Sequence, residues 1–276
     1  MNRHNLTVGI ALAAAAGLVP LIGRSAGTND TSTPAAWWRF DEGSGHTVRD
    51  ASGHGLDGEI HGALRWVPGV SGRGLSFDGN SFVEIPFDRR LLPTNGFTLQ
   101  AFIRPTDHAP NTYKHLAELG DTFLLRLDNP PEGGRLSFFT FLSGVPEPRL
   151  QAGVPSLGTW HQVLAVWNGR RMQLWLDGVK QERDRPGTLT SAASPLYLGR
   201  QFIGDIDEFK FYTRALTEDE LWDQIPPKPH LMLKVPHPLF EIGQRFSVSC
   251  EVTNAGGQSL EAGRLELALP PGLTLV

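Results

Sequence analysis

Cysteine is nearly absent from the sequence, because Cys250 is the only one in 276 residues. A single cysteine cannot form an internal disulfide bond, and it cannot build a cysteine-rich zinc site. The length of the chain fits one large β domain, or one domain with an additional segment.

An excess of basic residues is also lacking, since the formal net charge is −4. The sequence therefore offers no basic footprint, and we do not expect nucleic acid as a partner. Long helical periods are absent as well, whereas glycine (31) and proline (21) are plentiful. This combination predicts an all-β sandwich.

Residues 1–27 have the organisation of an export signal. Arg3 supplies the positive start, and residues 6–22 form an almost uninterrupted apolar run before a small-x-small cleavage site. A membrane anchor is the alternative, but the run is shorter than the ~20 residues that a membrane span prefers. Both interpretations place the body of the protein outside the cytoplasm, secreted or on the cell surface, after a polar linker at residues 28–35.

Residues 202–212 (FIGDIDEFKFY) alternate with a period of two, which predicts a strand whose i and i+2 side chains share a face. Asp205, Asp207, Phe209 and Phe211 then point the same way, and the phenylalanines mark this face as buried. Buried carboxylates are costly unless they are paired or bound to a cation. We therefore expect a cation or an ionic partner beside the two aspartates.

Two local signals are clear. Residues 160–179 predict a β-hairpin around Asn168-Gly169, the strongest two-residue turn signal. Residues 217–225 predict a helix, because Thr217 and Glu220 form a capping box and two prolines follow its end.

The order of six motifs resembles the laminin-G-like, concanavalin A-like jelly-roll family over residues 36–224. The resemblance implies two curved antiparallel sheets with a short helix after the last strand. The motifs are WRFDEGSG, DASGHGLDG, GRGLSFDG, FTLQAFIRP, TWHQVLAVWNGRRMQLWLDG and GDIDEFKFYTRALTEDEL.

The C-terminal segment resembles the start of an immunoglobulin-like repeat of bacterial surface proteins, on the stretch FSVSCEVTNAGGQSLEAGRLELALPPGLTLV. We expect it to be an incomplete β domain, because some 47 residues are too few to bury a good sandwich core. The expected organisation is a signal peptide (1–27), a linker (28–35), a jelly-roll domain (36–225), a proline-rich linker (226–229) and the incomplete domain (230–276).

The resemblance also implies a structural calcium ion where the first and last strands meet. Calcium prefers six to eight oxygen ligands from carboxylates and backbone carbonyls, and it would neutralise the two aspartates of the last strand. The alternative is that these aspartates cap turns by accepting backbone N–H groups. The candidate ligands are the carboxylates of Asp207, Asp41, Asp50 and Asp57 and the carbonyls of Gly45 and Gly55.

Catalysis is expected to be absent. Related jelly-rolls include β-glucanases and polysaccharide lyases, and the retaining glucanases carry Glu-x-Asp-x-x-Glu on one strand, with ~5 Å between the two catalytic carboxylates. The nearest match, at Glu182 and Asp184, lacks the third carboxylate, and Pro186 interrupts it. Neither Gly-x-Ser-x-Gly nor His-Glu-x-x-His occurs. A structural role is expected for His161, since no nucleophile or metal partner is near in sequence.

Exposed aromatic side chains indicate sugar binding, because they stack on the apolar faces of sugars. Trp175 alternates out of phase with its core neighbours and is one candidate; Tyr113 and Asn111 belong to a loop that can border a site. The alternative is that each aromatic ring fills space in the sandwich. We expect non-catalytic recognition of a carbohydrate or a cell-surface protein, with no membrane contact beyond the export signal. A structural spacer or a carbohydrate-active enzyme is the alternative function.

Overall fold

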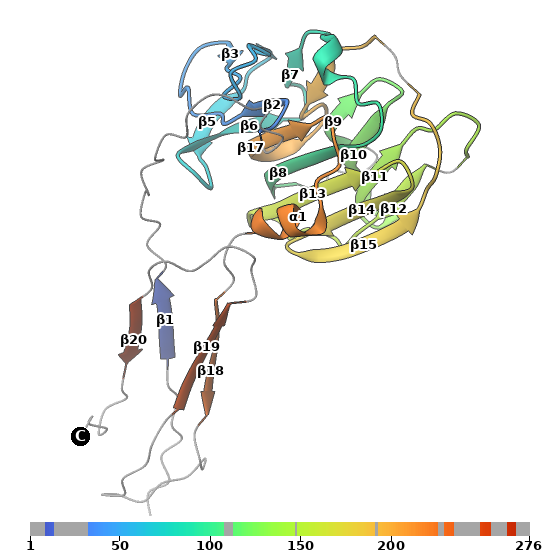
Figure 1. Ribbon diagram of the computed structural model, residues 1–276. Coiled ribbons are helices and arrows are strands. Elements are labelled where there is room, and N and C mark those ends of the chain that lie inside the picture. Colours follow the sequence, from blue (N-terminus) through green and yellow to red (C-terminus); the bar gives the residue numbers. More distant parts are fainter. Residues whose placement is uncertain are drawn as a thin grey trace, which may run out of the picture. The chain divides into compact units, whose positions relative to one another are not determined.

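The computed structural model contains two compact units, residues 29–221 and residues 1–28 with 222–276 (Figure 1). Side chains are described in residues 33–107, 113–146, 148–190 and 193–225. In the second unit the described strands are β1 (Gly9–Ala13), β18 (Pro229–Lys234), β19 (Ser249–Asn254) and β20 (Arg264–Ala268).

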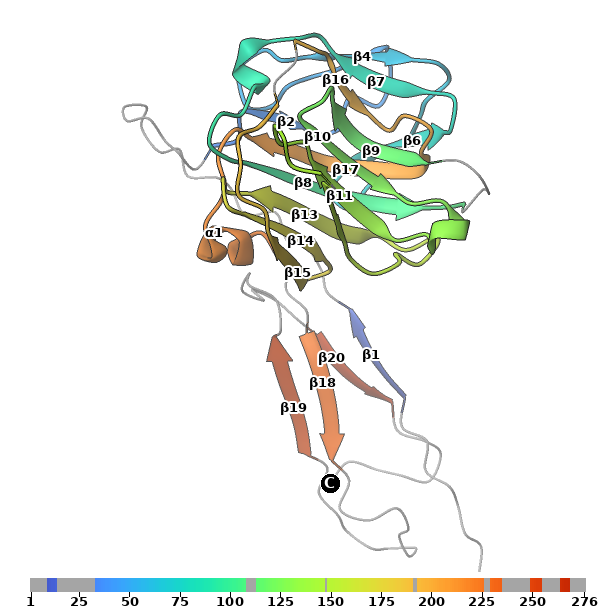
Figure 2. The ribbon, with the colours of Figure 1, turned by 90° about the vertical axis from the view of Figure 1, so that its right-hand side faces the viewer.

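The unit of residues 29–221 is a sandwich of two antiparallel sheets (Figure 2). The first, here called the β9 sheet, has the order β12 (Arg149–Gln151), β11 (Leu136–Thr140), β10 (Phe123–Leu127), β9 (Lys114–Leu119), β16 (Leu196–Leu198), β7 (Phe82–Ile85), β4 (Gly58–His61) and β3 (Thr47–Val48). The second, the β8 sheet, has the order β15 (Val179–Asp184), β14 (Arg171–Leu176), β13 (His161–Trp167), β8 (Phe97–Pro105), β17 (Ile203–Tyr212), β6 (Arg73–Asp78) and β5 (Arg65–Pro68), and β2 (Ala36–Trp38) pairs with β17. This is the all-β jelly-roll sandwich that the sequence predicts.

Aromatic side chains from both sheets meet between the layers. Phe97 stacks on Phe123 with ring centroids 5.0 Å apart, and it meets Phe138 edge-on at 5.7 Å. Phe211 lies 5.6 Å from Phe123 and joins the same cluster. Offset and edge-on pairs of this kind contribute beyond the area that they bury, and they fix how the two sheets pack.

The predicted orientation of β17 is wrong in its first half. Ile206 is in the core, so Asp205 and Asp207 lie on the opposite, outer face, whereas Phe209 is again in the core. A β-bulge between Asp207 and Lys210 inserts one residue opposite β8, and Glu208 takes a left-handed conformation with φ of 51°. One inserted residue reverses the face of every later side chain, which a simple period of two cannot reveal.

Both local predictions are confirmed. The strands β13 and β14 pair around the Asn168-Gly169 turn, where the Asn168 side chain accepts the backbone N–H of Arg171 at 2.8 Å. Helix α1 (Glu218–Asp223) begins with the predicted capping box. The Thr217 amide donates to Glu220 Oε2 at 2.8 Å, and the Glu220 amide donates to Thr217 Oγ1 at 3.3 Å.

The second unit contains two antiparallel pairs, β1 with β20 and β18 with β19. Three of these strands lie in the C-terminal segment, but an immunoglobulin-like arrangement is not demonstrated. The export signal at residues 1–27 stays a prediction. In the described part of the chain, no helix has the length and apolar character needed to cross a membrane.

The tight approach of Gly199 to the core gives a stability prediction. Gly199 has φ of +76°, and a Cβ atom there would overlap the ring of Phe77. Gly199→Ala should therefore lower the free energy of unfolding by about 2–4 kcal/mol, from left-handed strain and overpacking together. Gly158→Ala is the matched control, because Gly158 has φ of +72° but no atom within 4 Å of its added Cβ. Equal losses in denaturant titrations of the two variants would contradict this account.

The capping box gives a pH prediction. Hydrogen bonds from Arg214 lower the pKa of Glu220 to about 2. Because the folded pKa lies below the ordinary value of 4.5, the stabilisation is present above pH 4.5 and is lost as the pH falls toward 2. Glu220→Gln should lower the free energy of unfolding by about 0.5 kcal/mol at pH 7, a small value because solvent reaches the half-exposed pair and screens it. The difference from the wild type should vanish near pH 2, and a difference independent of pH would show that the charge is not responsible.

Candidate functional site

Asp207, the strongest candidate metal ligand, is fully buried beneath the turn between β5 and β6. Its Oδ2 accepts the backbone N–H groups of Val70 at 2.7 Å and Ser71 at 3.1 Å, and its Oδ1 accepts the N–H of Glu208 at 2.8 Å. Burial raises the pKa of Asp207 to about 7, and the hydrogen bonds offset only part of this effect. The side chain therefore holds the β5–β6 turn against β17.

Asp41 reaches the same turn from the loop after β2. Its Oδ1 accepts the N–H of Arg73 at 2.8 Å, and its Oδ2 pairs with Arg39 at 3.1 Å. Both carboxylate oxygens thus have partners within the protein.

Asp50 organises the loop that follows β3. Its carboxylate accepts the amides of Trp37 at 3.1 Å, Ser52 at 2.8 Å and Leu56 at 3.1 Å. Burial acts to raise the pKa of Asp50, but the hydrogen bonds from Ser52, Leu56 and Trp37 outweigh it and lower the pKa. Asp57 in turn accepts the Asp50 amide at 2.8 Å.

The described arrangement does not fit a calcium site built from these residues. Gly45 and Gly55 have positive φ angles of 91° and 71°, as turn positions do, and the aspartates accept backbone N–H groups. The described residues contain no group of three or more acidic, histidine or cysteine side chains that could hold a metal. Among the described residues, the buried Oε2 atom of Glu42 has no hydrogen-bond partner. Glu42 was not among the candidate ligands. Calcium stays a prediction, and the contacts correspond to the alternative of turn-capping aspartates.

Asp205 has the ionic partner that the sequence predicted in general terms. Arg104 Nε lies 2.6 Å from Asp205 Oδ2, and the register of β17 against β8 places the two residues opposite each other. The Arg104 guanidinium also lies 4.8 Å from the centre of the Trp160 ring. The aspartate is therefore neutralised without a metal ion.

The three predicted ligand-binding residues have different outcomes. Trp175 is on the outer face of its sheet, as its phase predicts, but only 6% of it is exposed and Lys180 Nζ lies 5.5 Å from the ring centre. A buried ring cannot stack on a sugar in this arrangement. Asn111 lies outside the described residues. Tyr113 is half-exposed and belongs to the surface described next.

The outer face of the β9 sheet carries a continuous row of half-exposed or exposed side chains, here called the outer row. Cross-strand pairing joins each member to the next, and none belongs to the hydrophobic core. Six strand spacings give the row a length of about 29 Å. Its members, from β12 to β4, are Arg149, Phe139, Leu124, Glu118, Tyr197, Glu84 and Glu59.

An aromatic and basic cluster lies at the β11 end of the outer row. The Arg126 guanidinium is 3.8 Å from the centre of the Tyr113 ring and 4.6 Å from that of Phe139. The buried Asp128 carboxylate fixes it, because Arg126 Nε donates to Asp128 Oδ1 at 2.9 Å. The Tyr113 hydroxyl donates to Glu132, which holds this ring in place as well.

A second aromatic cluster lies around Tyr197. The Arg200 guanidinium is 4.6 Å from the centre of the Tyr197 ring, and Phe82 meets that ring edge-on at 5.7 Å. Between the two clusters, Glu118 accepts a hydrogen bond from His115 at 2.9 Å, and this contact lowers the pKa of Glu118. The outer row thus offers aromatic rings, guanidinium groups and an ionised carboxylate, which suits a ligand that has both apolar faces and hydroxyl groups.

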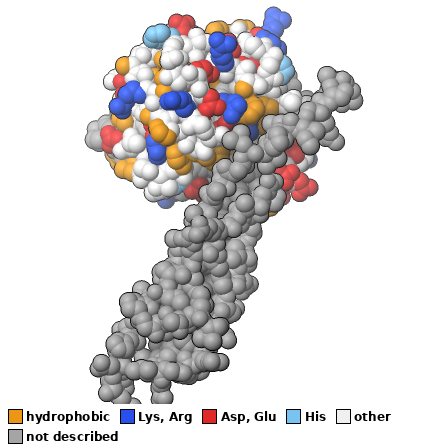
Figure 3. Space-filling model, turned by 90° about the vertical axis from the view of Figure 1, so that its left-hand side faces the viewer, with side chains coloured by type: hydrophobic (Ala, Val, Ile, Leu, Met, Phe, Trp, Pro, Cys, Tyr) orange, Lys and Arg blue, Asp and Glu red, His pale blue; other side chains and the backbone are white. Residues whose placement is uncertain are grey.

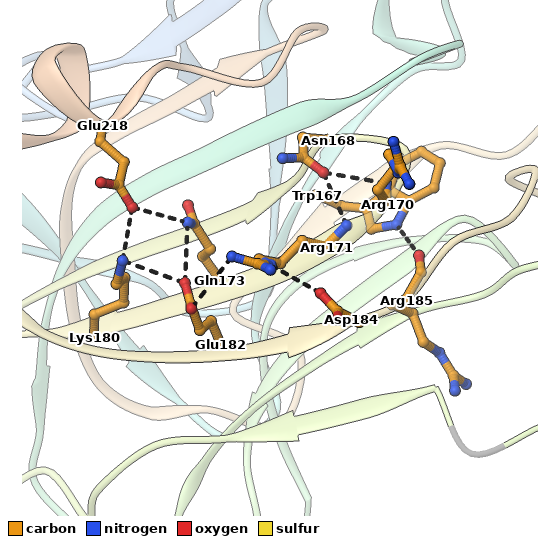
Figure 4. Close-up of polar contacts among 10 residues, drawn as sticks. All are labelled: Trp167, Asn168, Arg170, Arg171, Gln173, Lys180, Glu182, Asp184, Arg185 and Glu218. Carbon is orange, nitrogen blue, oxygen red and sulfur yellow. Dashed lines mark hydrogen bonds and ion pairs between the residues drawn. The ribbon is translucent and has the colours of Figure 1, made fainter.

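The acidic pair nearest to a glucanase motif is engaged in ion pairs on β15 (Figure 4). Arg171 lies 3.3 Å from Glu182 and 2.9 Å from Asp184, and Lys180 lies 3.2 Å from Glu182. Lys180 also pairs at 2.6 Å with Glu218, the first residue of helix α1. These contacts tie a sheet edge together, and both acids are compensated by cations.

His161 has partners that the sequence did not reveal. Its Nδ1 lies 2.6 Å from Asp177 Oδ2, and its Nε2 lies 3.0 Å from Ser156 Oγ and 3.1 Å from the Ser156 carbonyl. The ring connects the β14–β15 turn to the loop before β13, and a structural role for His161 stays a prediction.

The face of the sandwich unit in Figure 3 carries acidic, basic and hydrophobic side chains interspersed. The described side chains on that face form no extended field of one sign. The absence of a nucleic-acid partner stays a prediction.

Comparison with known proteins supports the fold. A family model described as the concanavalin A-like lectin/glucanases superfamily matches residues 77–221. No curated protein matches the chain. Domain 4 of AbnA, a GH43 extracellular arabinanase from Geobacillus stearothermophilus solved with arabinotriose, is 18% identical with a TM-score of 0.56, over 70% of this chain and 98% of that one.

Two toxin structures are also similar. The binding domain of Paraclostridial Mosquitocidal Protein 1 is 15% identical with a TM-score of 0.59, over 69% of this chain and 51% of that one. A structure of botulinum neurotoxin type C, whose cell entry is dependent upon interaction with two ganglioside molecules, is 11% identical with a TM-score of 0.56, over 70% of this chain and 50% of that one. The chain spans about half of each toxin structure, and at these identities the likeness shows the fold alone.

The calcium assignment has a direct test in the melting temperature of the full chain. If calcium binds at Asp207, a chelator should lower Tm, and Asp207→Asn should make Tm insensitive to the chelator. Binding would require the Val70 and Ser71 amides to turn away from the carboxylate. A melting curve that is unchanged by chelation would leave Asp207 as an acceptor for this turn and would rule out a structural calcium ion there.

Proposed function

The chain belongs to the concanavalin A-like lectin/glucanases superfamily, and from this premise we propose that it is a non-catalytic module that binds a carbohydrate on the outer row of the β9 sheet. The observation that carries the proposal is the outer row itself. Its two aromatic clusters and its ionised Glu118 lie on one face of one sheet.

Sugars combine apolar C–H faces with hydroxyl groups that donate and accept hydrogen bonds. Aromatic rings cover the apolar C–H faces, and fixed arginine and carboxylate groups form hydrogen bonds with the hydroxyl groups. In the outer row, Phe139 and Tyr197 supply rings, and Arg149 and Glu118 supply charged partners. The row is longer than a monosaccharide, so the ligand in this proposal is an oligosaccharide that lies across the strands.

The similar structures are consistent with this assignment. The arabinanase domain was solved with arabinotriose, and the neurotoxin interacts with gangliosides. A binding role also suits the acidic pairs of this chain. Glycoside hydrolysis uses one carboxyl group as a general acid and a second as a nucleophile or base. Glu182 and Asp184 instead both form ion pairs with Arg171.

The proposed setting is outside the cytoplasm, as a secreted or cell-surface protein. This part of the proposal rests on the apolar run and positive start of residues 1–27.

Binding to a glycan array, followed by titration of the best ligand, tests the function. Phe139→Ala and Tyr197→Ala should each weaken binding about tenfold or more, which corresponds to about 1.4 kcal/mol. Phe102→Ala is the matched control, because Phe102 is also a half-exposed phenylalanine in mid-strand but belongs to the β8 sheet. The wild-type protein should leave the bound oligosaccharide uncleaved.

Three results would overturn the proposal. They are the absence of binding to any glycan, equal effects of the three substitutions, and cleavage of the bound oligosaccharide. Melting temperatures of all three variants must be compared first, so that a loss of binding is not a loss of folding.

A further inference from the structure

A hollow of about 480 Å³ lies at the end of the sandwich unit, away from the outer row. No outer-row residue lines it. Its walls come from residues 33–35, the loop at His54, the short 3₁₀ helix η1 (Arg89–Leu91) and the end of β17 with the two residues after it. This volume is within the range of small-molecule sites and exceeds what a lone inorganic ion occupies.

Arg90, one of the arginines in the wall, is held rigidly by its neighbours. Its Nε and Nη2 donate to Asp88 at 2.9 and 2.7 Å, and its Nη1 donates to the His54 carbonyl at 2.7 Å. Hydrogen bonds from Arg90 lower the pKa of Asp88 to about 2, so the pair is charged at neutral pH. Asp88 itself is not part of the wall.

Arg214, in the segment that follows β17, is held in the same manner. Its Nη1 and Nη2 pair with Glu220 at 2.9 and 2.6 Å. Glu220 also lies outside the wall. Asp88 therefore orients Arg90, and Glu220 orients Arg214. Neither acid adds a carboxylate to the lining of the hollow.

Arg89 adds a positive charge without a counterpart. It is exposed, and no described residue forms an ion pair or side-chain hydrogen bond with it. The wall thus has three guanidinium groups and two compensating acids behind them. Guanidinium groups bind carboxylates in a planar, often bidentate geometry, which makes them selective for such groups.

We propose that this hollow binds an organic anion of monosaccharide size, such as a sugar acid, with its carboxylate on Arg89 and its ring against Leu92. Leu92 is half-exposed in the wall, where it offers apolar surface beside the arginines. The site is independent of the outer row, and it can be correct or wrong whatever the outer row binds.

Titration calorimetry or ligand-observed NMR with the full chain tests the site, with glucuronic acid as the probe and glucose as its neutral counterpart. Glucuronic acid should bind and glucose should not, and binding should weaken with added salt. Arg89→Ala should weaken binding of glucuronic acid about tenfold. Arg65→Ala is the matched control, because Arg65 is also exposed but lies on β5, outside the wall.

Inorganic sulfate, added as a competitor, tests whether the site needs more than a charge. Weak displacement of glucuronic acid by sulfate supports a site that also contacts the sugar ring. Displacement at equal concentration, equal binding of glucose, or an unchanged affinity in Arg89→Ala overturns the proposal. Phe139→Ala should leave this binding unchanged, and a loss there would instead assign glucuronic acid to the outer row.

Discussion

The bulge in β17 is the constraint on which the arrangement of both faces depends. This central strand pairs with β8, β6 and β2, and its inserted residue lets Ile206 and Phe209 both enter the core. The same change of phase sends Asp205 and Asp207 outward. Glu208, at the bulge, accepts a hydrogen bond from Trp37 Nε1 at 2.7 Å, so the irregular position is itself anchored to the first strand of the sandwich.

The acidic groups around this strand are satisfied within the protein. Asp205 pairs with Arg104, Asp207 accepts amides of the β5–β6 turn, and Asp50 accepts amides of its own loop. Each carboxylate thus fixes a segment that connects strands, and loop geometry is set by many charge-assisted hydrogen bonds. The outer row differs from this pattern, because its charged groups lie beside aromatic rings on an open sheet face.

Local signals in the sequence were sufficient for the local structure. Asn168-Gly169 specified a turn, and Thr217 with Glu220 specified a helix start, because each feature involves contacts over a few residues. The sandwich followed from the order of several motifs. The face of Asp207 was mispredicted, since a bulge is defined by the partner strand and not by the strand itself.

The candidate surfaces were harder to predict. Phe139, Glu118 and Tyr197 are far apart in sequence and become neighbours only through the strand order, which a single sequence does not contain. Arg89 carried no sequence signal, because an exposed arginine is ordinary until a hollow is seen beside it. Tyr113 lies beside the outer row and its role in binding stays a prediction, whereas Trp175, which was chosen for the same aromatic character, is buried.

The pairing of β2 with β17 also bears on how the chain acquires its fold. Trp37 and Glu208, which meet across this pairing, are 171 positions apart. Closing so long a loop is entropically costly, and topologies dominated by distant contacts fold slowly. During synthesis, β2 cannot pair with β17 until nearly the whole unit has been made. Slow closure of this kind is compatible with the export signal predicted at residues 1–27, since an exported chain has to be translocated before it folds.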